Sequence, residues 1–160
     1  MKSGKPVPEA DLDLLRLDRQ VCFPLYAASN LITRLYHPVL SRLGLTYPQY
    51  LVLLVLWEQS PQSVGNFSEL LHLDNGTVTP LLKRMEAAGL VTRQRDPQDE
   101  RRVLVSLTEA GDALRHEAQQ VPLTLGKGLH MSSAEIETLR DAVQNLVRIL
   151  ARREQSGGGG

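Results

Sequence analysis

The chain is poor in the residues that build metal and disulfide sites. Its 160 residues include one cysteine, Cys22, so no intrachain disulfide can form and no cysteine cluster can hold zinc. The four histidines show no ligand spacing: His37, His72, His116 and His130. There is also no nucleotide-binding loop and no catalytic triad. We therefore expect no metal, no cofactor and no enzymatic activity.

Long apolar runs and an excess of charge are also missing. No run approaches the roughly 20 apolar residues that span a membrane, and residues 1–10 lack the apolar core of a secretion signal. A cytoplasmic location without membrane association is therefore expected. Lysine plus arginine and aspartate plus glutamate number 18 each, so the formal net charge is zero. Overall charge thus gives no support to nucleic-acid binding, which must be argued from local arrangement.

Length and composition fit one domain with a proper core, because 42% of the residues are hydrophobic. We expect a disordered N-terminus at 1–10, a single domain at 11–153 and a flexible glycine-rich tail at 154–160.

Helical periodicity dominates the domain. The first helical stretch covers about 12–43, where Pro24 and Pro38 are each expected to start, kink or end a helix. The segment 46–57 is so apolar that it predicts a helix buried on most sides. Shorter helices are expected at about 66–72 and 75–88. The second should end at Gly89 and has one apolar face, made of Val78, Leu81, Leu82 and Met85.

The final helix is expected to begin at Ser132, because Glu135 three residues later completes a capping-box pattern. Its apolar residues form a narrow seam suited to pairing with another helix: Ile136, Leu139, Val143, Leu146 and Leu150.

One segment departs from the helical pattern. Residues 90–95 and 102–107 are rich in strand-forming types and flank the polar turn 96–100, which predicts a β-hairpin. Two helices followed directly by a hairpin is the order of a winged helix-turn-helix, placed here at about 46–108. The fold class is therefore mainly α with a small β-hairpin wing. The segment from Val64 to Thr108 is predicted to read the DNA duplex.

Candidate DNA contacts lie on the second helix and on the hairpin. They are Asn75, Thr77, Thr79, Lys83 and Arg84 on the helix, and Arg93, Arg95, Arg101 and Arg102 on the hairpin. Short polar side chains can reach base edges and phosphates, and arginines on a ribbon suit a narrow minor groove. Asp96 and Asp99 are better placed to hold the arginines than to contact DNA. The alternative is a plain surface helix pair with a solvated hairpin, and the order of the elements argues against it.

Two stretches carry a family resemblance. Residues 82–91 and 96–102 closely resemble the recognition helix and wing of the MarR family. The resemblance implies a homodimer on a pseudo-palindromic operator, with repression released by a small molecule or an oxidant. It also implies that Arg101 enters the minor groove and that the helices at about 12–43 and 109–153 build the dimer.

Cys22 lies in the sequence Val21-Cys22-Phe23-Pro24. If Pro24 is the first helical residue, Cys22 sits just outside a helix N-terminus, where the helix dipole favours a thiolate. The alternative is an inert, packed cysteine.

A second resemblance concerns this thiol. Residues 22–26, Tyr36 and residues 45–50 resemble the organic hydroperoxide resistance regulators within the MarR family, although Pro24 departs from the usual aliphatic residue. The resemblance implies that Cys22 is the peroxide-reactive thiol and that Tyr36 and Tyr47 of the partner subunit hydrogen-bond to it. Without it, both tyrosines would be expected simply to pack with their hydroxyls at the surface. A lone sulfenic acid must then cap with a small cellular thiol, form a sulfenamide or overoxidise.

The predicted function is a dimeric transcriptional repressor that leaves its operator when an organic hydroperoxide oxidises Cys22. The nearest alternative is a repressor released by a non-covalent phenolic or lipophilic ligand, with Cys22 merely lining the pocket. A thiol peroxidase would need a recycling route and has no use for a basic wing. A pure dimerisation module would not need the wing either.

Overall fold

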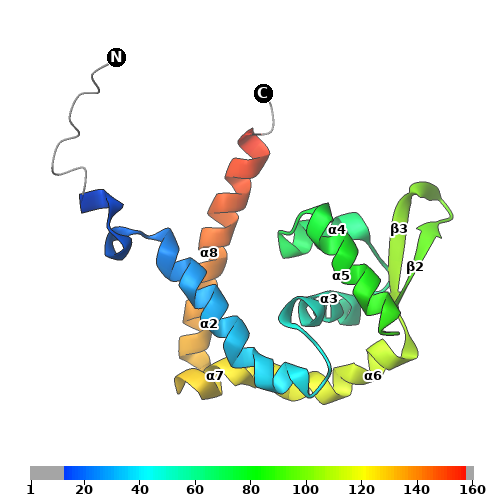
Figure 1. Ribbon diagram of the computed structural model, residues 1–160, viewed down its shortest axis with the longest axis horizontal. Coiled ribbons are helices and arrows are strands. Elements are labelled where there is room, and N and C mark those ends of the chain that lie inside the picture. The colour runs from blue at the N-terminus through cyan, green and yellow to red at the C-terminus, as the bar shows by residue number, and fades with distance from the viewer. Residues whose placement is uncertain (1–12, 158–160) are drawn as a thin grey trace, which may run out of the picture.

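The computed structural model describes residues 13–157 as seven α-helices, three short 3-10 helices and three strands (Figure 1). In chain order these are η1 Asp13–Leu15, η2 Leu17–Arg19, α2 Cys22–Ser41, α3 Tyr47–Glu58, β1 Gln62–Ser63, α4 Val64–Leu71, α5 Asn75–Ala87, β2 Val91–Asp96, β3 Asp99–Leu107, α6 Glu109–Glu117, η3 Ala118–Leu123, α7 Thr124–Leu129 and α8 Ser133–Gly157. The predicted winged helix-turn-helix is confirmed as α3 to β3. The disordered N-terminus predicted at 1–10 and the last three residues of the predicted tail lie outside the described residues.

Local capping fixes where three of the helices begin. Thr46 and Gln49 form a reciprocal capping box at the start of α3, in which the Gln49 side chain accepts from the Thr46 amide at 3.0 Å. Asp74 accepts from the Thr77 amide at 2.8 Å at the start of α5. The predicted box before α8 is confirmed, because Glu135 Oε2 accepts from the Ser132 amide at 2.8 Å and Ser132 Oγ caps in return.

Three boundaries differ from the sequence predictions. Helix α2 begins at Cys22, so Pro24 is its third residue, and Cys22 lies inside the first turn rather than outside it. Pro24 is tolerated there because amides of the first turn have no partner within the helix. Pro38 does not end α2, which continues through it to Ser41. Residues 154–157 are helical rather than part of a flexible tail, because 152–155 are good helix formers that prolong α8.

The wing is a three-stranded antiparallel sheet in the order β1-β3-β2. Strand β2 pairs with β3 from Val91 opposite Leu107 to Asp96 opposite Asp99, with an irregularity between Arg95 and Asp96. The predicted five-residue turn is therefore shorter than expected. Strand β1, which sequence reasoning did not find, adds Gln62 opposite Val105.

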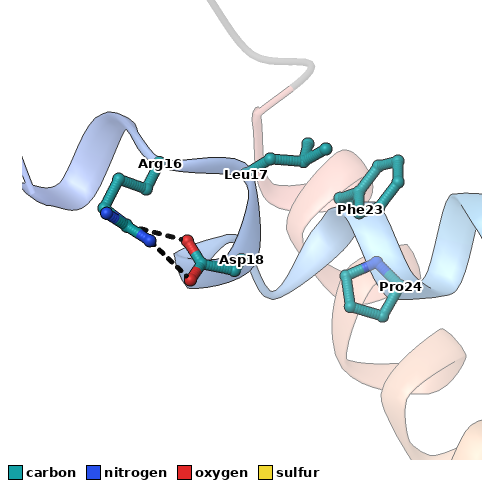
Figure 2. A pocket seen from close by; sticks show the side chains of 5 residues that line it. All are labelled: Arg16, Leu17, Asp18, Phe23 and Pro24. Carbon is teal, nitrogen blue, oxygen red and sulfur yellow. Dashed lines mark hydrogen bonds and ion pairs between the residues drawn. The ribbon is translucent and has the colours of Figure 1, made fainter.

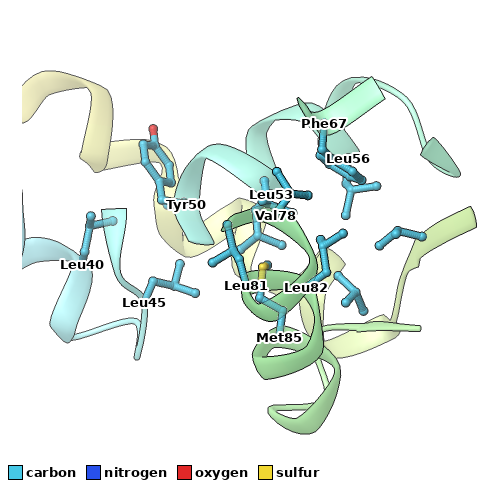
Figure 3. Close-up of a cluster of buried hydrophobic side chains, with 14 of the residues drawn as sticks. Leu40, Leu45, Tyr50, Leu53, Leu56, Phe67, Val78, Leu81, Leu82 and Met85 are labelled. Atoms are coloured by element: carbon cyan, nitrogen blue, oxygen red, sulfur yellow. The ribbon is translucent and has the colours of Figure 1, made fainter. Parts of the chain in front are cut away.

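The core of the winged helix lies between α3, α4, α5 and the sheet (Figure 3). The predicted inner face of α5 is confirmed, because Val78, Leu81, Leu82 and Met85 are all buried. Phe67 from α4 and Leu53 and Leu56 from α3 are buried beside them. Burial of such side chains contributes about 1.5–3 kcal/mol each, so α5 is held firmly against α3 and α4.

Helices α2 and α8 present apolar side chains that nothing in the described chain covers. No side chain from 133 to 156 on α8 is buried. Large exposed apolar residues on the two helices are Phe23, Leu25, Leu31, Leu139, Val143, Val147, Ile149 and Leu150. In Figure 1 both helices lie to the left of the winged helix; α2 is joined to it by the short loop before α3, and α8 through α6 and α7. Contiguous apolar surface of this kind is typical of a protein interface.

Gly111, in the first turn of α6, is packed too closely for any side chain. A Cβ at this position would overlap the carbonyl oxygen of Leu90 and lie 3.1 Å from a Leu107 methyl group. We expect Gly111→Ala to lower the free energy of unfolding by about 1–3 kcal/mol, measured by urea denaturation. The control is Gly65→Ala on α4, where the nearest atom is 4.0 Å away. Equal effects of the two substitutions would contradict the proposed close packing.

Candidate nucleic-acid interface and redox site

Helix α5 places most of the predicted DNA-contacting side chains in solvent. Asn75, Thr77, Lys83 and Arg84 are exposed, whereas Thr79 is half-buried. Asn75 also serves the turn before the helix, because Ser68 Oγ donates a hydrogen bond to its Oδ1 at 2.6 Å. The Asn75 amide group still has its donors available for a base edge or a phosphate.

Arg93 has a different environment from the one its predicted DNA contact requires. Its guanidinium donates from Nε and Nη2 to Glu86 Oε2 at 3.0 and 2.8 Å, and its backbone amide donates to Glu86 Oε1 at 3.0 Å. The Arg93 side chain is only 24% exposed. This forked pair ties strand β2 of the wing to helix α5, so Arg93 positions the wing.

The Glu86–Arg93 tie gives a pH-dependent prediction. Hydrogen bonds from Arg93 lower the pKa of Glu86 below its ordinary 4.5. The stability it contributes is therefore present at neutral pH and is lost as the pH falls through the lowered pKa. We expect Glu86→Gln to lower Tm at pH 7. The gap from the parent should begin to close near pH 4.5 and vanish at more acidic pH. A gap in Tm that stays constant from pH 7 to pH 3 would contradict this assignment.

The tip of the wing carries an almost fully exposed arginine. The Arg101 side chain is 90% exposed and its Nε lies 3.1 Å from Asp99 Oδ1. Arg102 lies 3.6 Å from the buried carboxylate of Asp96. Arg95 Nη1 donates to the Glu100 carbonyl at 2.8 Å across the hairpin. The prediction that Asp96 and Asp99 hold the arginines is confirmed.

Cys22 is exposed at the first position of α2. Tyr36 lies on the same helix, and at about 1.5 Å of rise per residue the two are roughly 20 Å apart. Tyr47, the first residue of α3, lies beside Tyr36. One chain therefore brings the two predicted tyrosines together and keeps its own thiol away from them.

The tyrosines form an aromatic row. The rings of Tyr36 and Tyr47 meet edge to face at 5.3 Å between centroids, and Tyr50 follows Tyr47 at 6.2 Å. Burial raises the pKa of Tyr36, with a smaller contribution from Tyr47, and burial also raises the pKa of Tyr47. Burial together with the neighbouring phenols raises the pKa of Tyr50 to about 12. The phenols therefore keep their protons at neutral pH and can donate hydrogen bonds.

A shallow apolar hollow of about 590 Å³ lies where η2 meets the start of α2 (Figure 2). Leu17, Phe23 and Pro24 line it, and the forked Arg16–Asp18 ion pair forms its polar side, at 3.0 Å for both bonds. Phe23, the residue next to Cys22, thus contributes an apolar surface that suits an apolar substrate better than a hydrated one.

From 13 to 157, no three histidine, cysteine, aspartate or glutamate side chains are gathered as a metal ion would require. None of the helices in this range is both long enough and apolar enough to cross a bilayer.

The helix pair α4–α5 and the arginine-tipped hairpin β2–β3, together called the reading head, define a winged-helix DNA-binding regulator. The family model for the transcriptional regulator SarA/Rot matches residues 34–118. The organic hydroperoxide resistance transcriptional regulator of Bacillus subtilis is 44% identical, over 91% of this chain and 99% of that protein. The chain belongs to the SarA/Rot family of transcriptional regulators, and its resemblance to the organic hydroperoxide resistance type is confirmed.

Solved structures agree with this assignment. AbfR of Staphylococcus epidermidis, reduced and bound to DNA, is 34% identical with a TM-score of 0.72, covering 89% of this chain and 97% of that one. AbfR has also been solved overoxidised and bound to DNA. A MarR family regulator from Rhodococcus sp. RHA1 is 25% identical with a TM-score of 0.72, covering 82% and 94%. The predicted MarR-type fold is therefore confirmed.

Proposed function

We propose that the chain is a cytoplasmic repressor that binds a pseudo-palindromic operator as a homodimer and is released when an organic hydroperoxide oxidises Cys22. One observation carries the proposal. The exposed thiol and the Tyr36–Tyr47 pair lie about 20 Å apart along α2, so a thiol–phenol site needs two chains. Oxidation at such a site would act on the geometry of the dimer.

The homodimer is supported by the apolar side chains of α2 and α8. Leu139, Val143 and Leu150 recur on one face of α8 and are 41–55% exposed. Pairing these faces with those of a second copy would remove them from water and would bring Cys22 of each chain toward the other's tyrosines.

The proposed chemistry consumes one hydroperoxide for each thiol. The Cys22 sulfur attacks the outer oxygen of ROOH, the O–O bond breaks, and the products are a Cys22 sulfenic acid and the alcohol ROH. A small cellular thiol then attacks the sulfenic sulfur, which gives a mixed disulfide and water. Each thiol therefore reacts once and switches the protein, rather than turning over as in a peroxidase. The basic wing serves to bind DNA, for which a peroxidase has no need.

DNA release follows from the geometry of a dimer on two half-sites. Recognition helices of such dimers fit half-sites about 34 Å apart, so a small change at the dimer centre misplaces both helices. AbfR has been solved on DNA in both a reduced and an overoxidised form. For this chain we therefore expect the mixed disulfide, the bulkiest of the products, to release DNA most effectively.

A second candidate is release by a non-covalent phenolic or lipophilic ligand. It is favoured by a cleft of about 970 Å³ between the turn before α5 and the C-terminal half of α8. Leu71, Leu73, Val147 and Leu150 contribute its apolar lining. A ligand there would push the reading head away from α8 without any change in the mass of the protein.

The experiment begins with selection of duplexes from a random library by the reduced protein, which supplies a probe without knowledge of the operator. Light scattering then gives the mass of the free protein, and the enriched duplex is titrated with and without cumene hydroperoxide and a small thiol. The proposal predicts a dimer, a pseudo-palindromic sequence and loss of binding on oxidation. A monomer, or a sequence without two-fold symmetry, would contradict it.

A further inference from the structure

Trp57 lies at the opposite end of α3 from Tyr47, the residue whose ring contacts Tyr36 of α2. Helix α3 begins at Tyr47 and places Tyr50 and Trp57 along the same face, with ring centroids 6.4 Å apart. Tyr47 and Tyr50 are themselves 6.2 Å apart. A continuous row of rings therefore runs from the Tyr36–Tyr47 pair to the far end of the helix.

The row ends at the junction that holds the reading head together. The indole Nε1 of Trp57 donates a hydrogen bond to the carbonyl oxygen of Gly111 at 3.1 Å, across 54 residues of sequence. Gly111 in turn packs against the carbonyl group of Leu90, which joins the recognition helix to the wing. This bond is therefore a direct polar link from α3 to the first turn of α6.

Two further hydrogen bonds close the junction. Thr108 Oγ1 donates to the Gly89 carbonyl at 2.6 Å, and the Thr108 amide donates to the Leu90 carbonyl at 3.1 Å. The end of α5, both ends of the β2–β3 hairpin and the start of α6 thus meet within one network. Because Gly111 packs closely against the Leu90 carbonyl group, a displacement of α6 at this point moves the hairpin as well.

We infer that Trp57 is the positioning residue that transmits the loss of the Cys22–tyrosine contact to the wing, through its bond to Gly111. The inference rests on the proposed redox function. When Tyr47 shifts, the row of rings on α3 shifts with it, and the indole N–H carries the displacement to the junction. Trp57 takes no part in the chemistry at Cys22.

The test uses Trp57→Phe in the full-length protein, since phenylalanine keeps a ring but removes the N–H. The dissociation constant for the enriched duplex is measured for the reduced and for the fully oxidised protein, and intact mass verifies modification at Cys22. We expect the same mass gain and a similar constant for the reduced protein. The ratio of the oxidised to the reduced dissociation constant should be about three- to tenfold smaller than in the parent. That factor corresponds to the net contribution of one hydrogen bond.

The control is Val52→Ala, a buried position on α3 whose apolar side chain can form no hydrogen bond. It weakens the core while leaving the indole bond in place, so its ratio should match that of the parent. If Trp57→Phe also keeps the parental ratio, the inference is overturned. If the parent itself keeps its DNA on oxidation, the proposed function fails and the inference fails with it.

A second measurement covers the case in which Trp57→Phe does not fold. Trp57 is the one tryptophan of the chain, so its fluorescence reports on this contact in the unaltered protein. Oxidation of the DNA-free parent should change the emission of Trp57, and Cys22→Ser should show no such change. Emission that stays constant while oxidation still abolishes DNA binding would overturn the inference.

Discussion

We expect Cys22→Ser to keep its DNA in the presence of an organic hydroperoxide, under conditions that should release the parent completely. Serine is close in size to cysteine but cannot form a sulfenic acid, so the switch has no first step. Because Cys22 is exposed at the first position of α2, the reduced affinity should stay within about twofold of the parent, as for most surface substitutions. The measurement is a DNA titration with and without cumene hydroperoxide.

Tyr47→Phe serves as the matched control, since it removes a phenol donor and keeps the thiol. We expect this variant still to be oxidised and released, but more slowly, because the hydrogen bond that favours the thiolate is lost. Release of Cys22→Ser by hydroperoxide would make the redox proposal wrong and would favour a non-covalent ligand in the cleft beside α8.

Arg101→Ala is expected to weaken operator binding more than any other single change in the wing. The Arg101 side chain is 90% exposed at the tip of the hairpin, and a specific contact of this type contributes about 1–3 kcal/mol. A dimer presents two such tips to one operator, so the loss should be about 2–6 kcal/mol for the complex. The dependence of log K on log salt should also become shallower, by about one unit for each tip.

Arg115→Ala is the control for the loss of a positive charge. Arg115 belongs to α6, a helix that lies away from the tip of the hairpin (Figure 1). Both variants should remain dimeric by light scattering and should be oxidised normally at Cys22. Loss of the dimer in Arg101→Ala, or an affinity equal to that of Arg115→Ala, would mean that the hairpin is not the wing.

The reading head could be predicted from the sequence because its signals are local. Apolar spacing marks the buried face of α5, Gly89 marks its end, and strand-forming runs around a polar turn mark the hairpin. The contacts that position these elements depend on distant residues. Neither the Glu86–Arg93 pair nor the Trp57–Gly111 bond leaves a periodic trace, and β1 is too short to give one.

The redox site was predictable only through resemblance. Local chemistry placed Cys22 near a helix start but expected the helix to begin at Pro24, whereas it begins at Cys22. The start was ambiguous because proline fits any of the first helical positions. No sequence pattern relates Cys22 to Tyr36 or Tyr47, because the proposed contact joins two chains. The apolar seam on α8 and the apolar early helix were the independent indications of such a dimer. Three of the five seam residues, Leu139, Val143 and Leu150, are exposed in the single chain, and Ile136 and Leu146 are half-buried.

The central claim is that DNA release is caused by oxidation of Cys22. The most direct test titrates one sample of protein–DNA complex with cumene hydroperoxide and a small thiol, and measures in each aliquot both the fraction of DNA released and the fraction of Cys22 modified by intact mass. The account predicts that the two fractions rise together and that the added mass lies on Cys22. Release with the thiol unmodified, or complete modification with the DNA still bound, would contradict it.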